Sequence, residues 1–487
     1  MVRASVIQAP LGRTSQRGKM VLKIHHIFLF LVGSFTLLYL AAISRFLYKG
    51  ESGQVHVGEK QIRLDTVIPT ALRSNVIPSD KDLPTSIIPL ELDNTQAPIP
   101  RATVAYAVSL TGCGSGLLTD GAAVLKHSIH LSSIHNKESG SLYSYKMYAI
   151  VHPSALSCSN QLSDAGYLIL ERDTPVPVSE IKGDYLRENV VNNGCCGEKE
   201  FIKLHAYTLL DHPVVVHLDL DTLVLRPMDE LFDAMLEQDN MKLTEDKLFN
   251  SVIYHQGKLD GTAVFTSKTP TMPPRVEAFF TRDYNMKPSQ KKTALVQGGF
   301  LVLRPSLETF REFQSLIRKG DFTNGGGWGG KGYSGYGAMT FQGIIPYFYD
   351  VIHPNTAIEL NRCIYNQMCD NPRDQRTVND LVSGNCRDGR EDCEDCRAVD
   401  FHVVKTAHFT LCQKPWSCLP HTENSLQHRL CRKLHHAWFR IRNDLEQSTK
   451  KSNESGSFQP DQFYGYCNGS GERNYIPIVL PPTQQTI

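Results

Sequence analysis

The sequence predicts an α/β fold in which a mostly parallel, mixed sheet carries helices on both faces. Segments alternate as strand, helix, strand and helix from Val104 to Ile150, the order expected of parallel strands joined by helical crossovers. The apolar run Val214–Val216 is typical of a buried parallel strand. Two acids, Asp219 and Asp221, follow this run, where strands of open α/β sheets end at a ligand crevice.

Length and charge limit the number of domains and the kinds of partner that the chain can have. The 487 residues allow one large domain with appendages, or two domains. The 51 Lys and Arg residues nearly cancel the 50 Asp and Glu residues, so the composition does not indicate a nucleic-acid partner.

The N-terminal region predicts a membrane anchor. Ile27–Ile43 contains no charged residue and approaches the length needed to span a bilayer, so we expect a signal-anchor helix over 24–45. Basic residues upstream predict a cytosolic tail over 1–23. A cleaved signal peptide is the alternative, because Ala41 and Ala42 are small. Either way the main domain would face a lumen, with the anchored form a single-pass type II protein of the Golgi or ER membrane.

Polar, proline-rich segments flank the predicted domain. Residues 46–100 contain six prolines after position 68 and no sustained periodicity, which predicts a stem. The stretch 448–487 predicts a loosely ordered tail. Asn453 and Asn468 begin Asn-x-Ser triplets in this tail and are predicted glycosylation sites.

Thirteen cysteines include eight between Cys363 and Cys431. Disulfides are expected if the domain lies in an oxidising lumen. Zinc is the alternative, because Cys393 and Cys396 form a Cys-x-x-Cys pair with Cys386 nearby. The odd total leaves at least one cysteine without an intramolecular partner.

The acids Asp219 and Asp221 are a candidate metal site. Strand periodicity points both side chains to the same side of the chain. Two close carboxylates repel each other unless a cation lies between them, and oxygen ligands favour Mg²⁺ or Mn²⁺. A divalent ion held there would clamp a diphosphate and neutralise its charge as it leaves.

Four ordered segments give the chain a family resemblance. The segment from Phe201 to Phe232, which includes both acids, is preceded by Ala102–Thr111 and followed by Val296–Ser306 and His408–Trp416. Together they resemble the glycogenin-like glycosyltransferases, family eight, over roughly residues 101–420. The resemblance implies a GT-A fold and a single catalytic domain over 101–447, with a cysteine-rich insertion at 363–431.

The resemblance also implies roles for individual residues. His408 would complete a metal site with Asp219 and Asp221, since neutral imidazole is a good Mn²⁺ ligand. Lys414 would bind the diphosphate as a point charge. Lys203, on a helix expected over 201–210, would contact donor phosphate or sugar and act in catalysis. The other implied donor-binding residues are Leu110, Thr111, Gln297, Gly298, Gly299 and Gln342, of which Gln342 is also expected to be catalytic.

The chain departs from the family pattern at Phe341. An acid, often given a sugar-orienting role, normally precedes the Gln-Gly pair that this chain keeps as Gln342 and Gly343. The glycine-rich run Gly325–Gly337 upstream predicts either a mobile lid over the sugar or a flexible connector.

The expected function is therefore a retaining, Mn²⁺-dependent (or Mg²⁺-dependent) glycosyltransferase. It would move a hexose or related sugar from a UDP-sugar to a glycan, glycoprotein or glycolipid in the lumen. The alternatives are a binding protein that kept the fold but lost turnover, and an interaction module built on the cysteine-rich insertion. Retention of Asp219, Asp221, His408 and Lys414 favours the enzyme.

Overall fold

The computed structural model describes residues 99–114, 118–236, 252–253, 273–287, 293–371, 373, 384–387, 394–417, 426–449 and 475–478. The chain divides into two compact units, 1–93 and 94–487, and every described residue belongs to the second. The predicted cytosolic tail, the anchor, nearly all of the stem, Asn453 and Asn468 lie outside the described residues.

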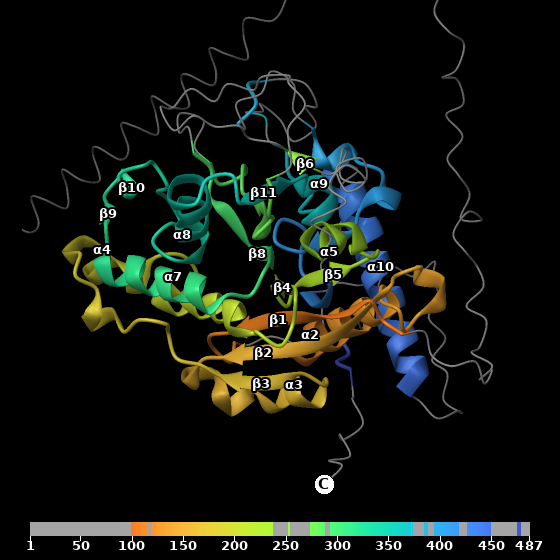
Figure 1. Cartoon of the computed structure of the whole chain (residues 1–487). Coiled ribbons are helices and arrows are strands. Elements are labelled where there is room, and N and C mark those ends of the chain that lie inside the picture. Colours follow the sequence, from red (N-terminus) through yellow and green to blue (C-terminus); the bar gives the residue numbers. More distant parts are fainter. Residues whose placement is uncertain are drawn as a thin grey trace, which may run out of the picture. The chain divides into compact units, whose positions relative to one another are not determined.

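An eight-stranded sheet forms the centre of the second unit, in the order β3-β2-β1-β4-β8-β7-β11-β6 (Figure 1). Strands β3, β2, β1 and β4 run parallel to one another, and so do β7 and β11. Strand β8 is antiparallel to both of its neighbours, and β6 is antiparallel to β11. The predicted mostly parallel, mixed sheet is thus confirmed. Its strands are β1 (Ala102–Leu110), β2 (Tyr143–Val151), β3 (Leu168–Glu171), β4 (Val215–Leu218), β6 (Val252–Ile253), β7 (Ala278–Arg282), β8 (Val296–Leu303) and β11 (Ala357–Leu360).

Two short two-stranded sheets accompany the main one. Strand β9 (Phe322–Thr323) pairs with β10 (Gly327–Trp328), and β5 (Thr222–Val224) pairs with β12 (Thr406–His408), both antiparallel. The α-helices are α2 (Leu118–Leu131), α3 (Asn160–Asp164), α4 (Asp184–Asn189), α5 (Asp229–Leu236), α7 (Leu307–Lys319), α8 (Phe341–Tyr347), α9 (Arg362–Tyr365) and α10 (Leu426–Thr449).

Both faces of the sheet are covered, as the apolar strands predicted. Along β1, Val104, Tyr106 and Val108 belong to the core shared with α2, α5 and α10. Ala105 and Ala107 belong to the opposite core, shared with α7 and α8. In Figure 1 these two groups of helices lie on opposite sides of the strands. This alternation follows from the two-residue period of a strand.

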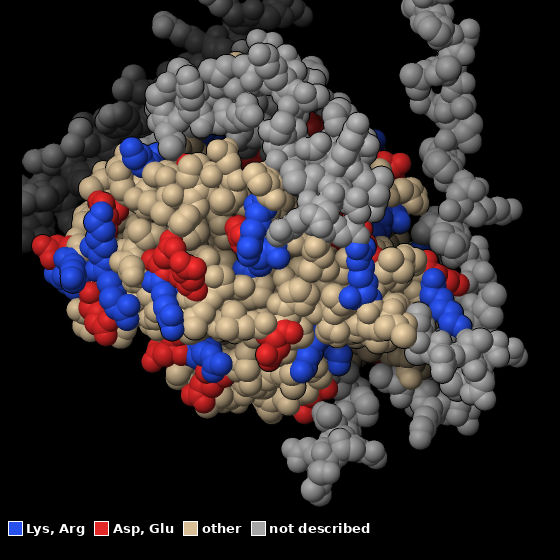
Figure 2. Space-filling model, in the orientation of Figure 1, with Lys and Arg blue, Asp and Glu red and all other residues tan. Residues whose placement is uncertain are grey.

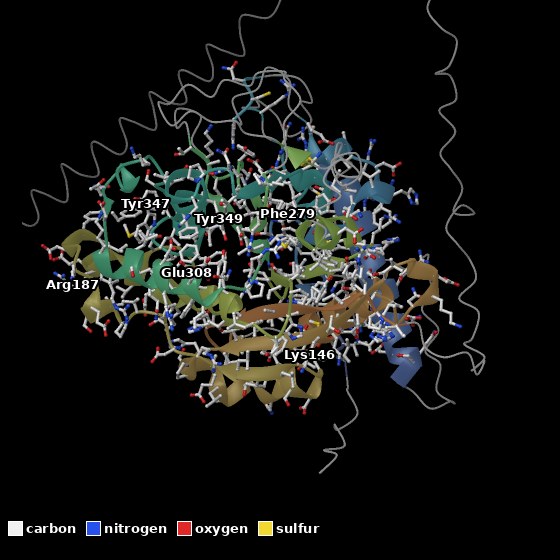
Figure 3. All side chains as sticks on the ribbon, viewed as in Figure 1. Lys146, Arg187, Phe279, Glu308, Tyr347 and Tyr349 are labelled. Carbon is white, nitrogen blue, oxygen red and sulfur yellow. A yellow bond between two sulfur atoms is a disulfide. The ribbon has the colours of Figure 1, made fainter. Side chains whose placement is uncertain are left out.

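Apolar side chains are buried inside the fold, and charged side chains lie on its surface. In Figure 3, the buried Phe279 lies on β7 and the buried Tyr347 on α8, with the buried Tyr349 in the π-helix that follows, whereas Lys146 on β2 and Glu308 on α7 are exposed. Figure 2 shows Lys and Arg interspersed with Asp and Glu on the visible face. This mixture agrees with the nearly balanced composition.

Helix α7 illustrates how local sequence fixes an element. Ser306 caps its start by accepting a hydrogen bond from the Thr309 backbone N–H at 3.2 Å. Gly320 ends it in the left-handed conformation, at φ 65°. The helix expected over 201–210 is observed as the 3-10 helix η6 (Gly197–Thr208), which begins earlier and ends sooner.

Disulfides, rather than zinc, account for the cysteine pairs that the structure describes. Cys113 bonds to Cys158, Cys363 to Cys396, and Cys412 to Cys431. Because Cys396 is consumed by a disulfide, it cannot act as a thiolate ligand in a Cys393–Cys396 zinc pair.

The predicted localisation requires a correction. Within the described part of the chain, no helix is long and apolar enough to cross a membrane. This finding overturns the expectation of a Golgi or ER single-pass membrane protein. The apolar run over 24–45 that motivated the expectation lies outside the described residues, and the described helices, α10 included, are amphipathic or short.

Candidate functional site

The two acids of the predicted metal pair lie at the carboxyl end of β4. The backbone N–H of Asp219 donates to Gly299 O on β8 at 3.2 Å, so the chain is still held to the sheet at this point. A turn follows, in which the Thr222 N–H donates to Asp219 O at 3.1 Å. The turn places Asp219 and Asp221 at the same end of the sheet as the carboxyl end of β1, because β1 and β4 are parallel.

Strand β12 brings His408 to these acids from far along the chain. His408 pairs with Thr222 in the β5–β12 ladder, and the Phe409 N–H donates to Asp221 O at 2.9 Å. The His408 Nε2 atom lies 3.3 Å from Asp221 Oδ1 and 3.9 Å from Asp219 Oδ2. The ligating atoms of the three residues all lie within 4.8 Å of one another. The structure therefore brings the three predicted metal ligands together.

The charge states of this cluster fit a divalent cation. Burial lowers the pKa of His408, which keeps its imidazole neutral with a lone pair available. Burial opposes ionisation of Asp219, but the Lys203 ammonium beside it outweighs burial and holds the pKa of Asp219 below its usual value. Two carboxylates and one neutral imidazole form a ligand set suited to Mn²⁺ or Mg²⁺.

Lys203 is buried and forms ion pairs with two acids. Its Nζ lies 2.9 Å from Asp219 Oδ1, 3.0 Å from Glu200 Oε2 and 3.2 Å from Gly298 O. Burial alone would lower the pKa of Lys203, but Asp219 and Glu200 raise it above its usual value, so the ammonium stays charged. Lys203 therefore orients Asp219 and offsets part of the negative charge at the site.

Lys414 reaches the metal cluster from the segment after β12. Its Nζ forms an ion pair with Asp221 Oδ2, and burial lowers its pKa. The segment is fixed by the Cys412–Cys431 disulfide to α10. Nearby Trp416 packs against Trp438 of α10, with ring centroids 5.8 Å apart, and against Gly121 of α2. These contacts give Trp416 a packing role.

The glycine pair on β8 separates two groups of site residues. A Cβ atom at Gly298 would lie 3.2 Å from Gln342 Cγ, and one at Gly299 would lie 2.9 Å from His408 Nδ1. Gln342, at the start of α8, is thus adjacent to Gly298 and Lys203, while His408 is adjacent to Gly299 and Asp219. Close approach of His408 requires glycine at 299, whereas a methyl group at 298 would need only a small shift of the flexible Gln342 side chain.

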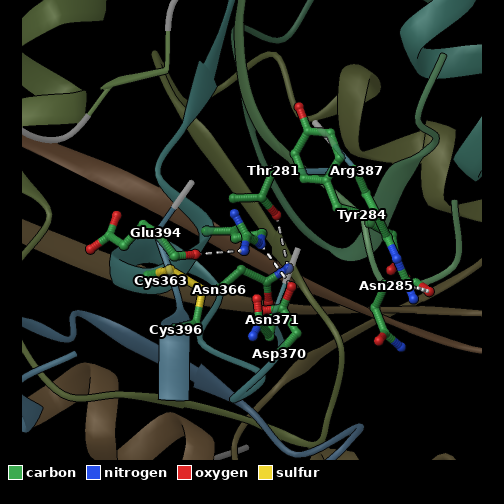
Figure 4. A network of polar contacts seen from close by, with 12 residues as sticks. Thr281, Tyr284, Asn285, Cys363, Asn366, Asp370, Asn371, Arg387, Glu394 and Cys396 are labelled. Carbon is green, nitrogen blue, oxygen red and sulfur yellow. Dashed lines mark hydrogen bonds and ion pairs between the residues drawn. A yellow bond between two sulfur atoms is a disulfide. The ribbon is translucent and has the colours of Figure 1, made fainter. Parts of the chain in front are cut away.

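Gln297 bonds to a buried polar network that contains Asn366 and Thr281 (Figure 4 shows these two). Its Oε1 accepts hydrogen bonds from the Gly299 N–H at 2.6 Å and from Asn366 Nδ2 at 3.3 Å. Asn366 also donates to Thr281 Oγ1 at 2.9 Å. With its oxygen engaged in this way, Gln297 supports the glycine pair rather than offering an acceptor to a ligand.

Phe341 is fully buried at the first position of α8. Its ring lies 5.7 Å from Lys203 Nζ and 6.1 Å from the His217 ring. The position where the resemblance implies an acid is therefore occupied by an aromatic ring that covers the buried lysine.

Leu110 and Thr111, which the sequence predicts to contact a nucleotide, lie at the carboxyl end of β1. Leu110 is the last residue of β1, and Thr111 follows it. The β1–β4 register places this end of the strand beside the acids.

Three neighbouring residues escaped the sequence reasoning. Glu200 precedes Lys203 by one helical turn, a spacing that could have predicted their ion pair. His217 precedes Asp219 by two residues and so points to the same face; its Nε2 lies 2.8 Å from Ser109 Oγ. Burial lowers the pKa of His217 to about 3. Nothing in the sequence marked Ser109.

Comparison with known proteins gives distant structural neighbours. No protein-family model matches the chain, and no curated protein sequence matches it. Among solved structures, mouse xyloside xylosyltransferase 1 is 14% identical with a TM-score of 0.36, covering 64% of this chain and 99% of its own. The galactosyltransferase LgtC with donor and acceptor sugar analogues is 11% identical with a TM-score of 0.33, covering 69% and 95%.

A third neighbour, the bifunctional glycosyltransferase WbbM, is 12% identical with a TM-score of 0.34, and the alignment covers 71% of this chain. The chain spans about half, 52%, of the WbbM chain. All three TM-scores lie below 0.5, so the site is interpreted from its own geometry.

Proposed function

We propose that this protein is a metal-dependent glycosyltransferase. It would transfer a hexose or related sugar from a UDP-sugar to a hydroxyl of a glycan, glycoprotein or glycolipid, with retention at the anomeric carbon. The observation that carries the proposal is the convergence of Asp219, Asp221 and His408 within 4.8 Å at the carboxyl ends of the parallel strands β1 and β4. That edge of an open α/β sheet is where nucleotide ligands usually bind.

The residues of the cluster suit the departure of a diphosphate. When bound, Mn²⁺ or Mg²⁺ would neutralise negative charge on the leaving UDP. Lys414, the more exposed of the two lysines, is ion-paired with Asp221 and stands ready to exchange this partner for a phosphate oxygen. Lys203 is buried and stays with Glu200 and Asp219, so it orients the metal-binding acid. Fixed charges of this kind stabilise a transition state without reorganisation.

The sugar would lie beside Gly298 and Gln342. Gly298 leaves its backbone open to close approach, and Gln342 offers both a donor and an acceptor. Gln342 Nε2 makes only a long contact, 3.4 Å, to Val296 O. Its side chain can therefore turn towards a sugar hydroxyl at little cost.

Phe341 supports one alternative, a protein that binds a nucleotide sugar without turning it over. A buried ring cannot accept hydrogen bonds from sugar hydroxyls. The two functions agree on donor binding and differ on turnover.

The test is release of UDP from a panel of UDP-sugars, with and without Mn²⁺, by the purified chain. We expect metal-dependent release by the wild type, and a fall of at least about a hundredfold in Asp221→Asn, the order seen when one electrostatic stabiliser is lost. Asp211→Asn, an exposed acid before β4, is the matched control and should behave as the wild type. Full activity in excess EDTA would refute the metal-dependent mechanism. Metal-dependent UDP binding without release from any sugar would favour the binding protein.

A further inference from the structure

Two adjacent free cysteines lie in the turn that leads into η6. Cys195 and Cys196 are neither in a disulfide nor in the core, and their Sγ atoms are 2.8 Å apart. Glycines flank the pair, Gly194 at φ 74° and Gly197 at φ 60°. These positive φ values turn the chain sharply and place both thiols on the same side of the turn.

The turn touches two parts of the candidate site. Cys195 Sγ donates to Glu200 Oε1 at 3.1 Å, and Glu200 is the acid that pairs with Lys203. On its other side the turn packs on the end of the glycine-rich run: a Cβ atom at Gly194 would lie 3.2 Å from Gly337 Cα, and Asn193 Oδ1 accepts from the Met339 N–H at 3.0 Å.

We propose that Cys195 and Cys196 form a reversible vicinal disulfide, a redox-sensitive modification site beside the Glu200–Lys203 pair of the candidate site. The sulfur atoms already lie closer than two unbonded sulfurs normally approach, and no side chain stands between them. The two thiols differ in reactivity: the contact between their sulfur atoms lowers the pKa of Cys196, whereas that contact, burial and the nearby Glu200 carboxylate raise the pKa of Cys195. Cys196 is thus the attacking thiol.

The reaction balances with a small-molecule disulfide as oxidant. The Cys196 thiolate attacks one sulfur of the oxidant and displaces the first small thiol. The Cys195 sulfur, after losing its proton, then attacks Cys196 Sγ and displaces the second. One small disulfide is reduced to two thiols, and two protein thiols become one disulfide. The Cys195 hydrogen bond to Glu200 is lost in the oxidised state.

Adjacent cysteines should form a more labile disulfide than the three that the structure describes. Neighbouring Cα atoms across a trans peptide are about 3.8 Å apart, below the usual disulfide range. The Cα atoms of Cys113–Cys158, Cys363–Cys396 and Cys412–Cys431 are 5.7, 4.7 and 5.5 Å apart. Strained and exposed disulfides are the more easily reduced ones.

A metal site made of Cys195, Cys196 and Glu200 fits less well. Their ligating atoms lie within 4.8 Å of one another. However, two thiolates on a tetrahedral zinc, at about 2.3 Å each, would lie roughly 3.8 Å apart, farther than the 2.8 Å observed. Glu200 is also already paired with the Lys203 ammonium, which would repel a second cation.

Differential alkylation tests the disulfide without any substrate, so its outcome is independent of the proposed function. The native chain is equilibrated in buffers of graded thiol-to-disulfide ratio, alkylated, and digested with trypsin. The peptide 188–199 contains only these two cysteines. We expect it unalkylated and lighter by two hydrogens in oxidising buffer. It should become doubly alkylated at a thiol concentration at least about tenfold below that needed to open Cys113–Cys158.

Single variants provide the controls. In Cys195→Ser or Cys196→Ser the remaining thiol cannot form the bond and should carry one alkyl group, or one small-molecule adduct, in every buffer. The proposal is overturned if both wild-type thiols are alkylated in oxidising buffer. It is equally overturned if the pair opens only together with the three described disulfides, or if the wild type carries stoichiometric zinc that Cys195→Ser loses.

Discussion

Gly299 on β8 leaves the space that the His408 imidazole from β12 occupies. A Cβ atom at residue 299 would lie 2.9 Å from His408 Nδ1, closer still to Cε1, and 3.0 Å from Asp219 Oδ2. Real Cβ atoms essentially never approach other atoms below 3.0 Å, so any larger residue must displace His408 or Asp219. A single methyl group added at residue 299 is therefore expected to disrupt the arrangement of His408 and Asp219.

Gly299→Ala should weaken Mn²⁺ binding by about ten- to a hundredfold, the effect of disturbing the support of a metal ligand. Calorimetric titration of Mn²⁺ measures it. Gly298→Ala is the matched control: its Cβ would meet Gln342 rather than a metal ligand, so Mn²⁺ affinity should be unchanged. Equal Mn²⁺ affinity in wild type and Gly299→Ala would show that His408 is not a ligand.

Lys203→Met should destabilise the fold by about 3–5 kcal/mol, because it leaves two partly buried acids without their cation. The double variant Lys203→Met, Glu200→Gln should recover part of the loss, since one of those acids is then neutral. Denaturant unfolding of the three proteins measures both effects. A single variant as stable as the wild type would mean that Lys203 does not hold these acids.

Gln342→Ala should lower turnover of the UDP-sugar by about tenfold or more while leaving UDP affinity nearly unchanged. Gln342 lies next to Gly298, on the side of β8 away from His408, so the contacts to the diphosphate survive. Steady-state kinetics and UDP titration measure the two effects separately. Wild-type turnover in this variant would place the sugar elsewhere.

Because His217 is buried, the free energy of unfolding should decrease as the pH falls. Its pKa is about 3 in the folded protein and 6.5 as an unperturbed side chain. Below pH 6.5 the unfolded chain therefore binds a proton that the folded chain does not. Neutral His217 therefore makes its full contribution to the free energy of unfolding above pH 6.5. Between pH 6.5 and about pH 3, this contribution falls by about 1.4 kcal/mol for each pH unit.

Unfolding free energies between pH 7 and 5 test this for His217→Gln, which keeps a side chain able to bond Ser109. The variant should show a shallower pH dependence than the wild type. His402→Gln removes an exposed histidine and should leave the slope unchanged. Parallel curves for wild type and His217→Gln would mean that His217 titrates normally in the folded state.

Part of the candidate site could be predicted from the sequence because the residues that indicate it are neighbours in the chain. The run Val214–Val216 and the acids after it are contiguous, so strand periodicity alone placed Asp219 and Asp221 at a strand end. The family resemblance predicted a role for Lys203. It did not predict that Glu200, one helical turn away, forms an ion pair with this lysine. The lysine is held between two acids, and that arrangement depends on the position of η6 against β4.

The sequence by itself determined the class of fold and the two acids, because alternating apolar strands and a strand-end acid pair are features of neighbouring residues. It did not determine which cysteines pair, or that Phe341 is buried over Lys203. Only the tertiary structure decided these, as it decided the distance from His408 to Asp221. That distance depends on the β5–β12 ladder and on the glycine at 299. These contacts join segments far apart in the chain, and packing, rather than any local propensity, fixes them.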